Sequence, residues 1–319
     1  MSQAPNIDGV LIQWGDRLFY PGNRVVKVKP QPKLNAGAAR QRAAAIRERI
    51  EATVVRRAPQ VMVKVTGGGR GMKAIAAHFR YISKNGRLDI EDERGETMSG
   101  KDTLPELADD WRFGGTLIED VGDRREAFNI MLSMPRRTDP LTVQRAAREF
   151  AQIELADHKY VMVLHDHQAN PHVHISVRAE SKHGKRLNPR KADLHRWRET
   201  FAEKLRDRGV EAEATRQATR GALRNYDPIW RVKASEEKRL RSHRPAMKIG
   251  EGPRRSREAA LESWRHLAQA LGSSPQSTDQ RLAAGIEKFL VAQQLPAPDQ
   301  GDRDTRTSQV QQHDVRGSR

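Results

Sequence analysis

Histidines are concentrated in one short segment of the sequence. Six of the 11 lie within residues 158–183, and the centre of this group reads LHDHQANPHVHI over residues 164–175. His172 and His174 are separated by one residue in a strand-like stretch, so both side chains point to the same face. The short polar turn before them predicts an antiparallel hairpin that brings His165 to that face as well.

Three neutral imidazoles with this spacing suit a divalent metal ion that keeps open coordination positions. His167 lies in the turn and is expected to face elsewhere, although it is an alternative ligand. Incidental surface or DNA-contacting histidines are the competing interpretation, and it is the one we adopt for His158 and His183. The ligands that the pattern predicts are His165, His172 and His174.

Tyrosine is the candidate nucleophile, because the sequence has no cysteine and therefore no thiol nucleophile, disulfide or thiolate metal site. Tyr81 follows a triple-glycine loop on a predicted helix. Its neighbours Arg80 and Lys84 are cations suited to holding a phosphate and lowering the pKa of a phenol. Taken alone, an aromatic residue on a helix is more often a packing residue. The other tyrosines are Tyr20, Tyr160, for which sheet packing is expected, and Tyr226.

The composition indicates a polyanionic partner, most often nucleic acid. The 319 residues include 58 Lys and Arg against 41 Asp and Glu, a net charge of +17. Only 36% of the residues are hydrophobic, so part of the chain is not expected to form a core. No apolar run approaches the roughly 18 residues of a membrane span, and the N-terminus does not resemble a signal peptide, so we expect a cytoplasmic protein without membrane insertion.

The elements that position these residues alternate between strands and helices, which indicates an α/β or α+β layer fold. Strands are expected at 61–65, 128–133, 160–164 and 173–177, and helices at 71–83, 104–113, 140–155 and 194–208. We expect three parts: a basic N-terminal extension (1–59) with a hairpin at 10–20 and an Ala/Arg-rich helix at 38–55, a compact domain (60–225), and a basic tail (226–319). Within the tail, residues 231–258 are strongly basic, 257–271 and 279–294 have helical patterns, and 296 onward is expected to be disordered.

Three motifs in order resemble those of the relaxase/mobilisation nuclease family, the MobA/Vir-type conjugative relaxases of the His-hydrophobic-His endonuclease superfamily. Residues 63–86, which include Tyr81, resemble the nucleophile motif. Residues 130–135 followed by Thr138 and Asp139 resemble the middle motif, and His165 with residues 170–174 resembles the three-histidine motif. The resemblance covers residues 60–222.

This resemblance implies an α+β fold in which a central antiparallel sheet carries the histidines and the nucleophile helix lies across it. It also implies a site- and strand-specific nick at a transfer origin, made by attack of Tyr81 on the scissile phosphate. A 5′-phosphotyrosine and a free 3′-OH would result, and the reverse reaction would reseal the strand. A divalent metal ion, Mg²⁺ or Mn²⁺, would offset charge in the transition state; imidazole ligands make Zn²⁺ similarly plausible. The residues expected to contact DNA are Arg80, Lys84, Ser133 and Asn170.

One position departs from the family pattern, which usually has Asp two residues after the first histidine. Here that position is His167, with Asp166 beside it. Either residue is a candidate to orient a ligand histidine or to accept the tyrosine proton, and the sequence leaves both open.

The resemblance further implies accessory relaxosome proteins and a type IV secretion coupling protein as partners, besides the origin DNA. Two other functions stay open at this point. A rolling-circle replication initiator uses the same chemistry, and a catalytically inactive DNA-binding accessory protein would keep the fold. The basic segment 231–258 is expected to contact DNA, and residues 302–319 are expected to serve secretion.

Overall fold

The computed structural model describes residues 6–20, 35–167, 170–223 and 247–294, together with a few single positions between 225 and 245. The chain divides by its contacts into two compact units. We call residues 51–216 the sheet unit, and we call the described parts of residues 6–50 and 217–294 the helical unit. The three-part division expected from the sequence stays a prediction.

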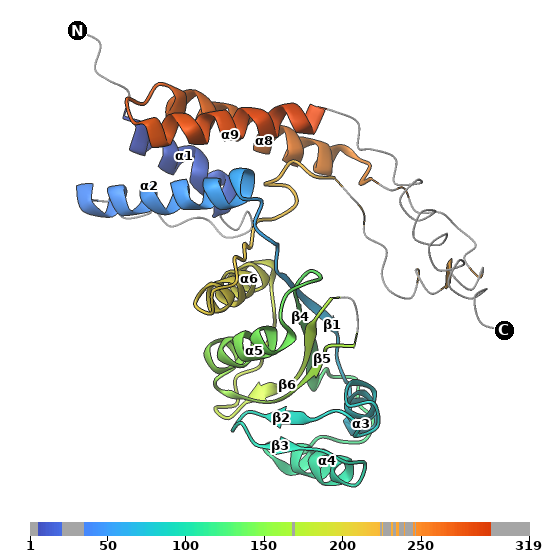
Figure 1. The fold of residues 1–319 in the computed structure, drawn as a ribbon. Helices are drawn as coiled ribbons and strands as arrows, with labels where there is room; N and C mark the ends of the chain where they lie inside the picture. The colour runs from blue at the N-terminus through green and yellow to red at the C-terminus, as the bar shows by residue number, and fades with distance from the viewer. Residues whose placement is uncertain are drawn as a thin grey trace, which may run out of the picture. The chain divides into compact units, whose positions relative to one another are not determined.

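Six strands form one antiparallel sheet in the order β1-β4-β6-β5-β2-β3 (Figure 1), which confirms the α+β class. Four of them match the predicted strands closely, because apolar residues alternate along them. The strands are β1 (Met62–Gly67), β2 (Ile90–Asp92), β3 (Thr97–Met98), β4 (Ala127–Ser133), β5 (His158–His165) and β6 (His172–Ser181).

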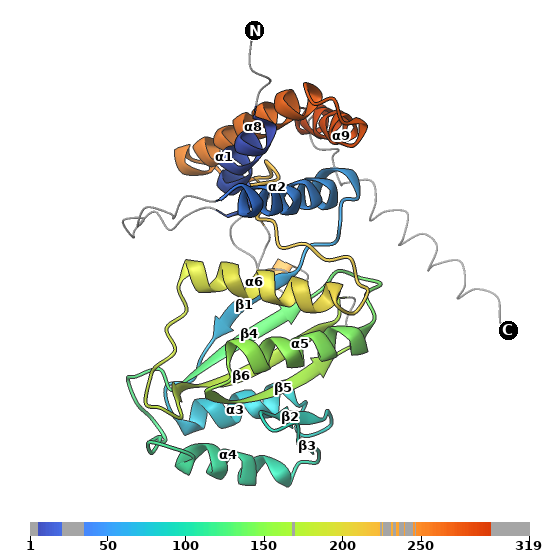
Figure 2. The ribbon, with the colours of Figure 1, turned by 90° about the vertical axis from the view of Figure 1, so that its left-hand side faces the viewer.

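Two pairs of helices cover the two faces of the sheet (Figure 2). Helices α5 (Pro140–Glu154) and α6 (Lys191–Arg206) bury one core, and α3 (Met72–Ile82) and α4 (Thr103–Phe113) bury the other. Val173, Ile175 and Val177 of β6 belong to the first core. Because side chains alternate along a strand, His172 and His174 project to the opposite face, where α3 lies.

Strands β2 and β3 were not expected from the sequence. They are three and two residues long, too short for a period to be recognised. Glu91 of β2 is buried and forms an ion pair with Arg148 of α5, with Nη2 2.7 Å from Oε2. A buried carboxylate therefore stands where an apolar residue would have marked a strand.

The predicted hairpin at 10–20 is wrong, because this segment is helix α1 (Ile7–Phe19). Asn6 caps it by accepting a hydrogen bond from the Gly9 N–H. Gly15 suggested a turn, but in the structure it permits close helix packing: a Cβ there would lie 2.5 Å from a side-chain carbon of Ile46. Leu11 and Leu18 lie seven residues apart, about two helical turns, so they share one face of the helix, and both are buried.

The helical unit combines segments from both ends of the chain. Helix α2 (Ala36–Ile50) covers most of the predicted 38–55 helix and continues into a π-helical turn, η1 (Glu51–Val55), of the sheet unit. Helices α8 (Glu251–Gly272) and α9 (Ser277–Gln294) confirm the two helical patterns in the tail. Phe19 packs edge-on against Trp264, with 5.8 Å between ring centroids, and Arg47 forms an ion pair with the buried Asp279.

The remaining expectations for the tail lie outside the described residues. This holds for most of the basic segment before α8, for the residues from 296 onward and for residues 302–319. None of the described helices combines the length and apolar character needed to cross a membrane.

Candidate active site

The β5–β6 hairpin brings three buried histidines together, as the sequence predicted. His165 stands opposite His172 in the strand register, and His174 lies one pleat further along the same face. Their ring centroids are 4.6–5.0 Å apart, and one ring nitrogen from each lies within 4.8 Å of the others. We call these three residues the histidine cluster.

Hydrogen bonds to backbone carbonyls determine which ring nitrogens carry protons in two members of the cluster. His165 Nε2 lies 2.7 Å from the Ile82 carbonyl and His172 Nδ1 lies 2.9 Å from the Asn170 carbonyl. A carbonyl only accepts, so each of these nitrogens is the donor and the other nitrogen of its ring keeps a free lone pair. Among the described atoms, the buried Nδ1 of His174 has no hydrogen-bond partner.

Burial keeps the cluster uncharged at neutral pH. It lowers the pKa of His165 and His172 below the ordinary value, and burial together with the neighbouring imidazoles lowers the pKa of His174 to about 3. Three convergent neutral imidazoles, one with an orphaned buried nitrogen, fit a divalent metal ion.

Tyr81 lies beside the cluster on α3. Its side chain is 66% exposed, and its ring is edge-on to His174 with 6.2 Å between centroids. The helix is tied to the cluster directly, because the Ile82 carbonyl that accepts from His165 follows Tyr81 in the chain. A phenol open to solvent next to a candidate metal site can approach an incoming phosphate.

His78 was missed as a site residue by the sequence interpretation. It precedes Tyr81 by three residues, so the two side chains share a helix face. Its ring stacks on Tyr81 at 6.0 Å and is edge-on to His174 at 6.4 Å. Burial lowers the pKa of His78 to about 4, so this fourth imidazole is also neutral. The spacing of three residues on the helix was the available signal.

The triple-glycine loop fixes where α3 begins. The Gly69 N–H donates to the Ala127 carbonyl at 3.1 Å, and the Gly69 carbonyl accepts from the Glu126 N–H at 2.7 Å. A Cβ on Gly68 would lie 2.1 Å from the Ala127 oxygen, so only glycine permits this approach between the loop and β4.

The other predicted site residues differ in how deeply they are buried. Arg80, Lys84 and Asn170 are exposed, whereas Ser133 is buried opposite His172, with its hydroxyl 3.3 Å from the Pro171 carbonyl. Asp166 is exposed in the turn after β5.

His167 was expected to face away from the cluster. Its ring lies 5.2 Å from that of His165, at the edge of the cluster. The three-residue group whose nitrogens converge does not include it.

Comparison with known proteins identifies the domain. A family model for the nuclease domain of MobA/VirD2-like relaxases matches residues 81–210. The sheet unit contains a MobA/VirD2-like relaxase nuclease domain. The match begins at Tyr81 and ends in the loop after α6, so both the tyrosine and the histidine cluster of this relaxase domain lie within it.

A solved structure described as "Molecular Basis of Vancomycin Resistance Transfer in Staphylococcus aureus" is 16% identical to this chain. The alignment covers 50% of this chain and 99% of that chain, with a TM-score of 0.30. Comparison with curated proteins gave no match.

Proposed function

We propose that this chain is a conjugative or mobilisation relaxase that nicks one DNA strand at a transfer origin. The observation that carries this proposal is the exposed Tyr81 ring 6.2 Å from a buried histidine of a three-histidine cluster, within a relaxase nuclease domain. An exposed phenol beside neutral imidazoles suits phosphodiester exchange, because the nucleophile can reach a bound strand.

In the proposed step, the Tyr81 oxygen attacks the scissile phosphorus. The Oη–P bond forms as the bond from phosphorus to the 3′ oxygen breaks, which leaves a 5′-phosphotyrosine. The phenol gives up its proton, for which Asp166 or His167 in the adjacent turn is the candidate acceptor, and the released 3′ oxygen takes up a proton. The exposed Arg80 and Lys84 hold neighbouring phosphates. Attack by a 3′-OH reverses these bond changes and reseals the strand without an external energy source.

The histidine cluster would hold a divalent metal ion. When bound, such an ion polarises the phosphate oxygens and offsets the charge that develops during transfer. The donor set of three imidazoles would suit Mn²⁺ or Zn²⁺ at least as well as Mg²⁺, because Mg²⁺ prefers oxygen ligands. Within the cluster, the backbone carbonyls that fix His165 and His172 orient their free lone pairs.

The partners we propose are single-stranded or supercoiled origin DNA, accessory relaxosome proteins and a type IV secretion coupling protein. These interactions would take place in the cytoplasm, before the DNA leaves the cell. The net charge of +17 supports the nucleic-acid partner.

Supercoiled plasmid carrying a candidate origin, incubated with the full chain and Mn²⁺, tests this proposal. We expect open circles with covalently attached protein, and Tyr81→Phe should give neither product while it binds DNA as the parent does. The Phe variant should fold normally, because the side chain is largely exposed. An adduct formed by Tyr81→Phe would refute Tyr81 as the nucleophile; Tyr160, the second choice from the sequence, is buried in the core and its pKa is raised to about 12, so it does not suit that role. DNA binding without any nick by the parent chain would favour the inactive accessory protein.

A further inference from the structure

A second feature of the relaxase domain lies on the sheet face away from the histidine cluster. An open pocket of about 420 Å³ has a floor of Val65, Phe128 and Leu194, which contribute to the core beneath α5 and α6. Arg70, Arg125 and Asn188 supply polar groups to its wall. A cavity of this size can hold a small ligand, and the proposed chemistry does not use it.

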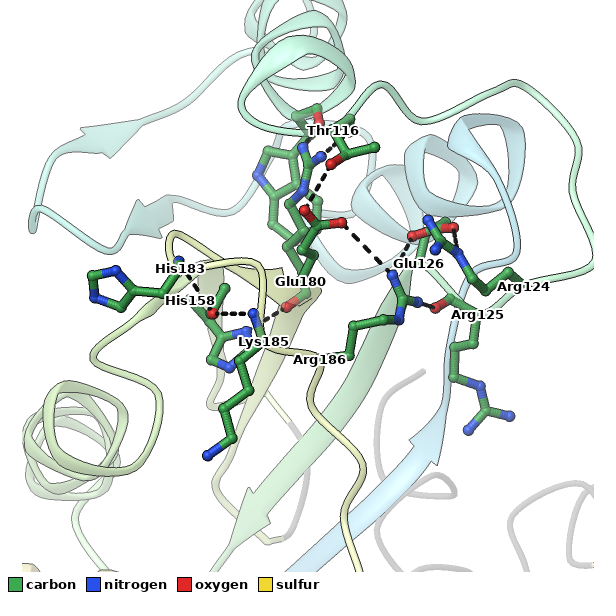
Figure 3. A network of polar contacts seen from close by, with 12 residues as sticks. Thr116, Arg124, Arg125, Glu126, His158, Glu180, His183, Lys185 and Arg186 are labelled. Carbon is green, nitrogen blue, oxygen red and sulfur yellow. Dashed lines mark hydrogen bonds and ion pairs between the residues drawn. The ribbon is translucent and has the colours of Figure 1, made fainter.

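A network of ion pairs and a hydrogen bond holds the backbone at Arg125 in place (Figure 3). Glu126 binds Arg124 on one side, with Nε to Oε1 at 2.7 Å, and Arg186 on the other, with Nη1 to Oε2 at 3.2 Å. Although burial raises the pKa of Glu126, these two hydrogen bonds lower it below the ordinary value, so the carboxylate stays charged. Arg186 also donates to the Arg125 carbonyl. Figure 3 shows the Arg125 side chain directed away from this network.

The glycine loop lies against Arg125, and Arg70, which follows the loop, lines the same pocket. Gly69 is hydrogen-bonded to both Glu126 and Ala127, and a Cβ on Gly68 would lie 3.0 Å from the Cδ of Arg125. Backbone contacts between the glycine loop and residues 125–127 thus bring Arg70 and Arg125, which are far apart in sequence, to the same pocket.

The two guanidinium groups are available to a ligand. Within the part of the chain that the structure describes, neither Arg70 nor Arg125 forms an ion pair, although Asp123 also lines the pocket. The Arg125 guanidinium lies 5.1 Å from the Phe128 ring centroid, so cation and aromatic ring together form one corner of the pocket. Arginine is well suited to phosphate because it can donate two parallel hydrogen bonds.

We propose that this pocket binds one nucleotide of the single-stranded DNA substrate, a role that rests on the proposed relaxase function. Its phosphate lies against Arg70 and Arg125, and its base lies over the apolar floor. Because the Asp123 carboxylate repels phosphate, the base edge, with its N–H and carbonyl groups, faces Asp123 and Asn188. The combination of a basic wall with an apolar or aromatic floor is typical of sites that bind single strands without strict sequence preference.

The test measures binding of fluorescein-labelled (dT)20 by fluorescence anisotropy at several salt concentrations. All proteins are full-length and carry Tyr81→Phe, so that no strand is cut. Arg70→Ala and Arg125→Ala should each lower the log–log salt slope by about 0.7, the value for one lost phosphate contact on a single strand. Arg145→Ala is the matched control, because Arg145 is an exposed arginine on α5 outside the pocket.

Photocrosslinking locates the nucleotide independently. A (dT)20 in which some thymines are replaced by 5-iodouracil should crosslink to Phe128 or to the peptide that contains residues 188–194. The crosslink should weaken when both Arg70 and Arg125 are replaced by alanine.

The outcomes separate this inference from the proposed function. Unchanged slopes for Arg70→Ala and Arg125→Ala, or an equal loss for Arg145→Ala, would overturn the nucleotide pocket even if the parent chain nicks DNA. Lowered slopes together with the expected crosslink would support nucleotide binding by the pocket even if the parent chain fails to nick an origin. In that case only the proposed nicking function would be refuted.

Discussion

Replacing Gly68 with alanine should destabilise the relaxase domain and displace α3. The added Cβ would lie 2.1 Å from the Ala127 carbonyl oxygen, whereas ordinary contacts begin near 3.4 Å, so loop and strand must separate by about 1 Å. This separation breaks the hydrogen bonds of Gly69 with Glu126 and Ala127. Over-packing costs about 1–3 kcal/mol, and each lost backbone hydrogen bond costs about 1 kcal/mol. We expect the free energy of unfolding to fall by about 3 kcal/mol.

Urea denaturation measures this loss. With a slope of about 2 kcal/mol per molar urea, the midpoint for the relaxase domain should fall by about 1.5 M. Gly67→Ala is the matched control, because the Cβ at the neighbouring position comes no closer than 3.8 Å to another residue. The Gly68 variant should also nick DNA more slowly, since the same loop sets the start of the helix that carries Tyr81. If the two alanine variants unfold at the same urea concentration, our explanation of the glycine loop is wrong.

Three further predictions concern the metal, the pH and the charge. His172→Ala and His174→Ala should each weaken Mn²⁺ binding by more than about tenfold in calorimetric titration. His167→Ala should weaken it less, and equal losses for all three variants would contradict the assignment of His172 and His174 as ligands. The metal-free chain should lose stability as the pH falls below about 6.5, because histidines whose pKa is lowered by burial stay neutral when folded and take up protons when unfolded. Urea denaturation at several pH values would measure this loss: the free energy of unfolding should fall by up to about 1.4 kcal/mol per pH unit for each such histidine. A free energy of unfolding that does not change with pH in this range would refute the prediction. A fragment of residues 51–216 has 30 Lys and Arg against 26 Asp and Glu, a net charge of +4, compared with +17 for the full chain. The DNA affinity of this fragment should therefore depend less on salt than that of the full chain. If the log–log salt slope is unchanged, the flanking segments have a role other than DNA binding.

Local patterns were sufficient to predict most of the relaxase domain. The alternation that places His172 and His174 on one face is a property of any strand, and the hairpin followed from a short polar turn. The start of α5 was equally local: Asp139 accepts a hydrogen bond from the Thr142 N–H at 2.8 Å, with proline at the first helical position.

Features that depend on distant residues were not predictable in this way. A glycine such as Gly15 gives the same sequence signal in a turn as in a close helix crossing, and only the Ile46 side chain decides between them. The ion pair between Arg47 and Asp279 joins residues 232 positions apart, and no local sequence pattern predicts it. The position of His78 beside Tyr81 was available from the spacing, but its contact with His174 required the tertiary structure.

The helical unit has a consequence for the order in which the protein matures. Its first helices, α1 and α2, leave the ribosome before the relaxase domain, and α8 and α9 leave after it. The contacts of Phe19 with Trp264 and of Arg47 with Asp279 therefore cannot form until more than 200 further residues are translated. At about 5–20 residues per second, this delay is roughly ten seconds or more, long enough for the relaxase domain to fold first. The nascent chain thus carries a folded nuclease domain while the surfaces of α1 and α2 that pack on α8 and α9 are still uncovered, and we expect any chaperone to act in this interval.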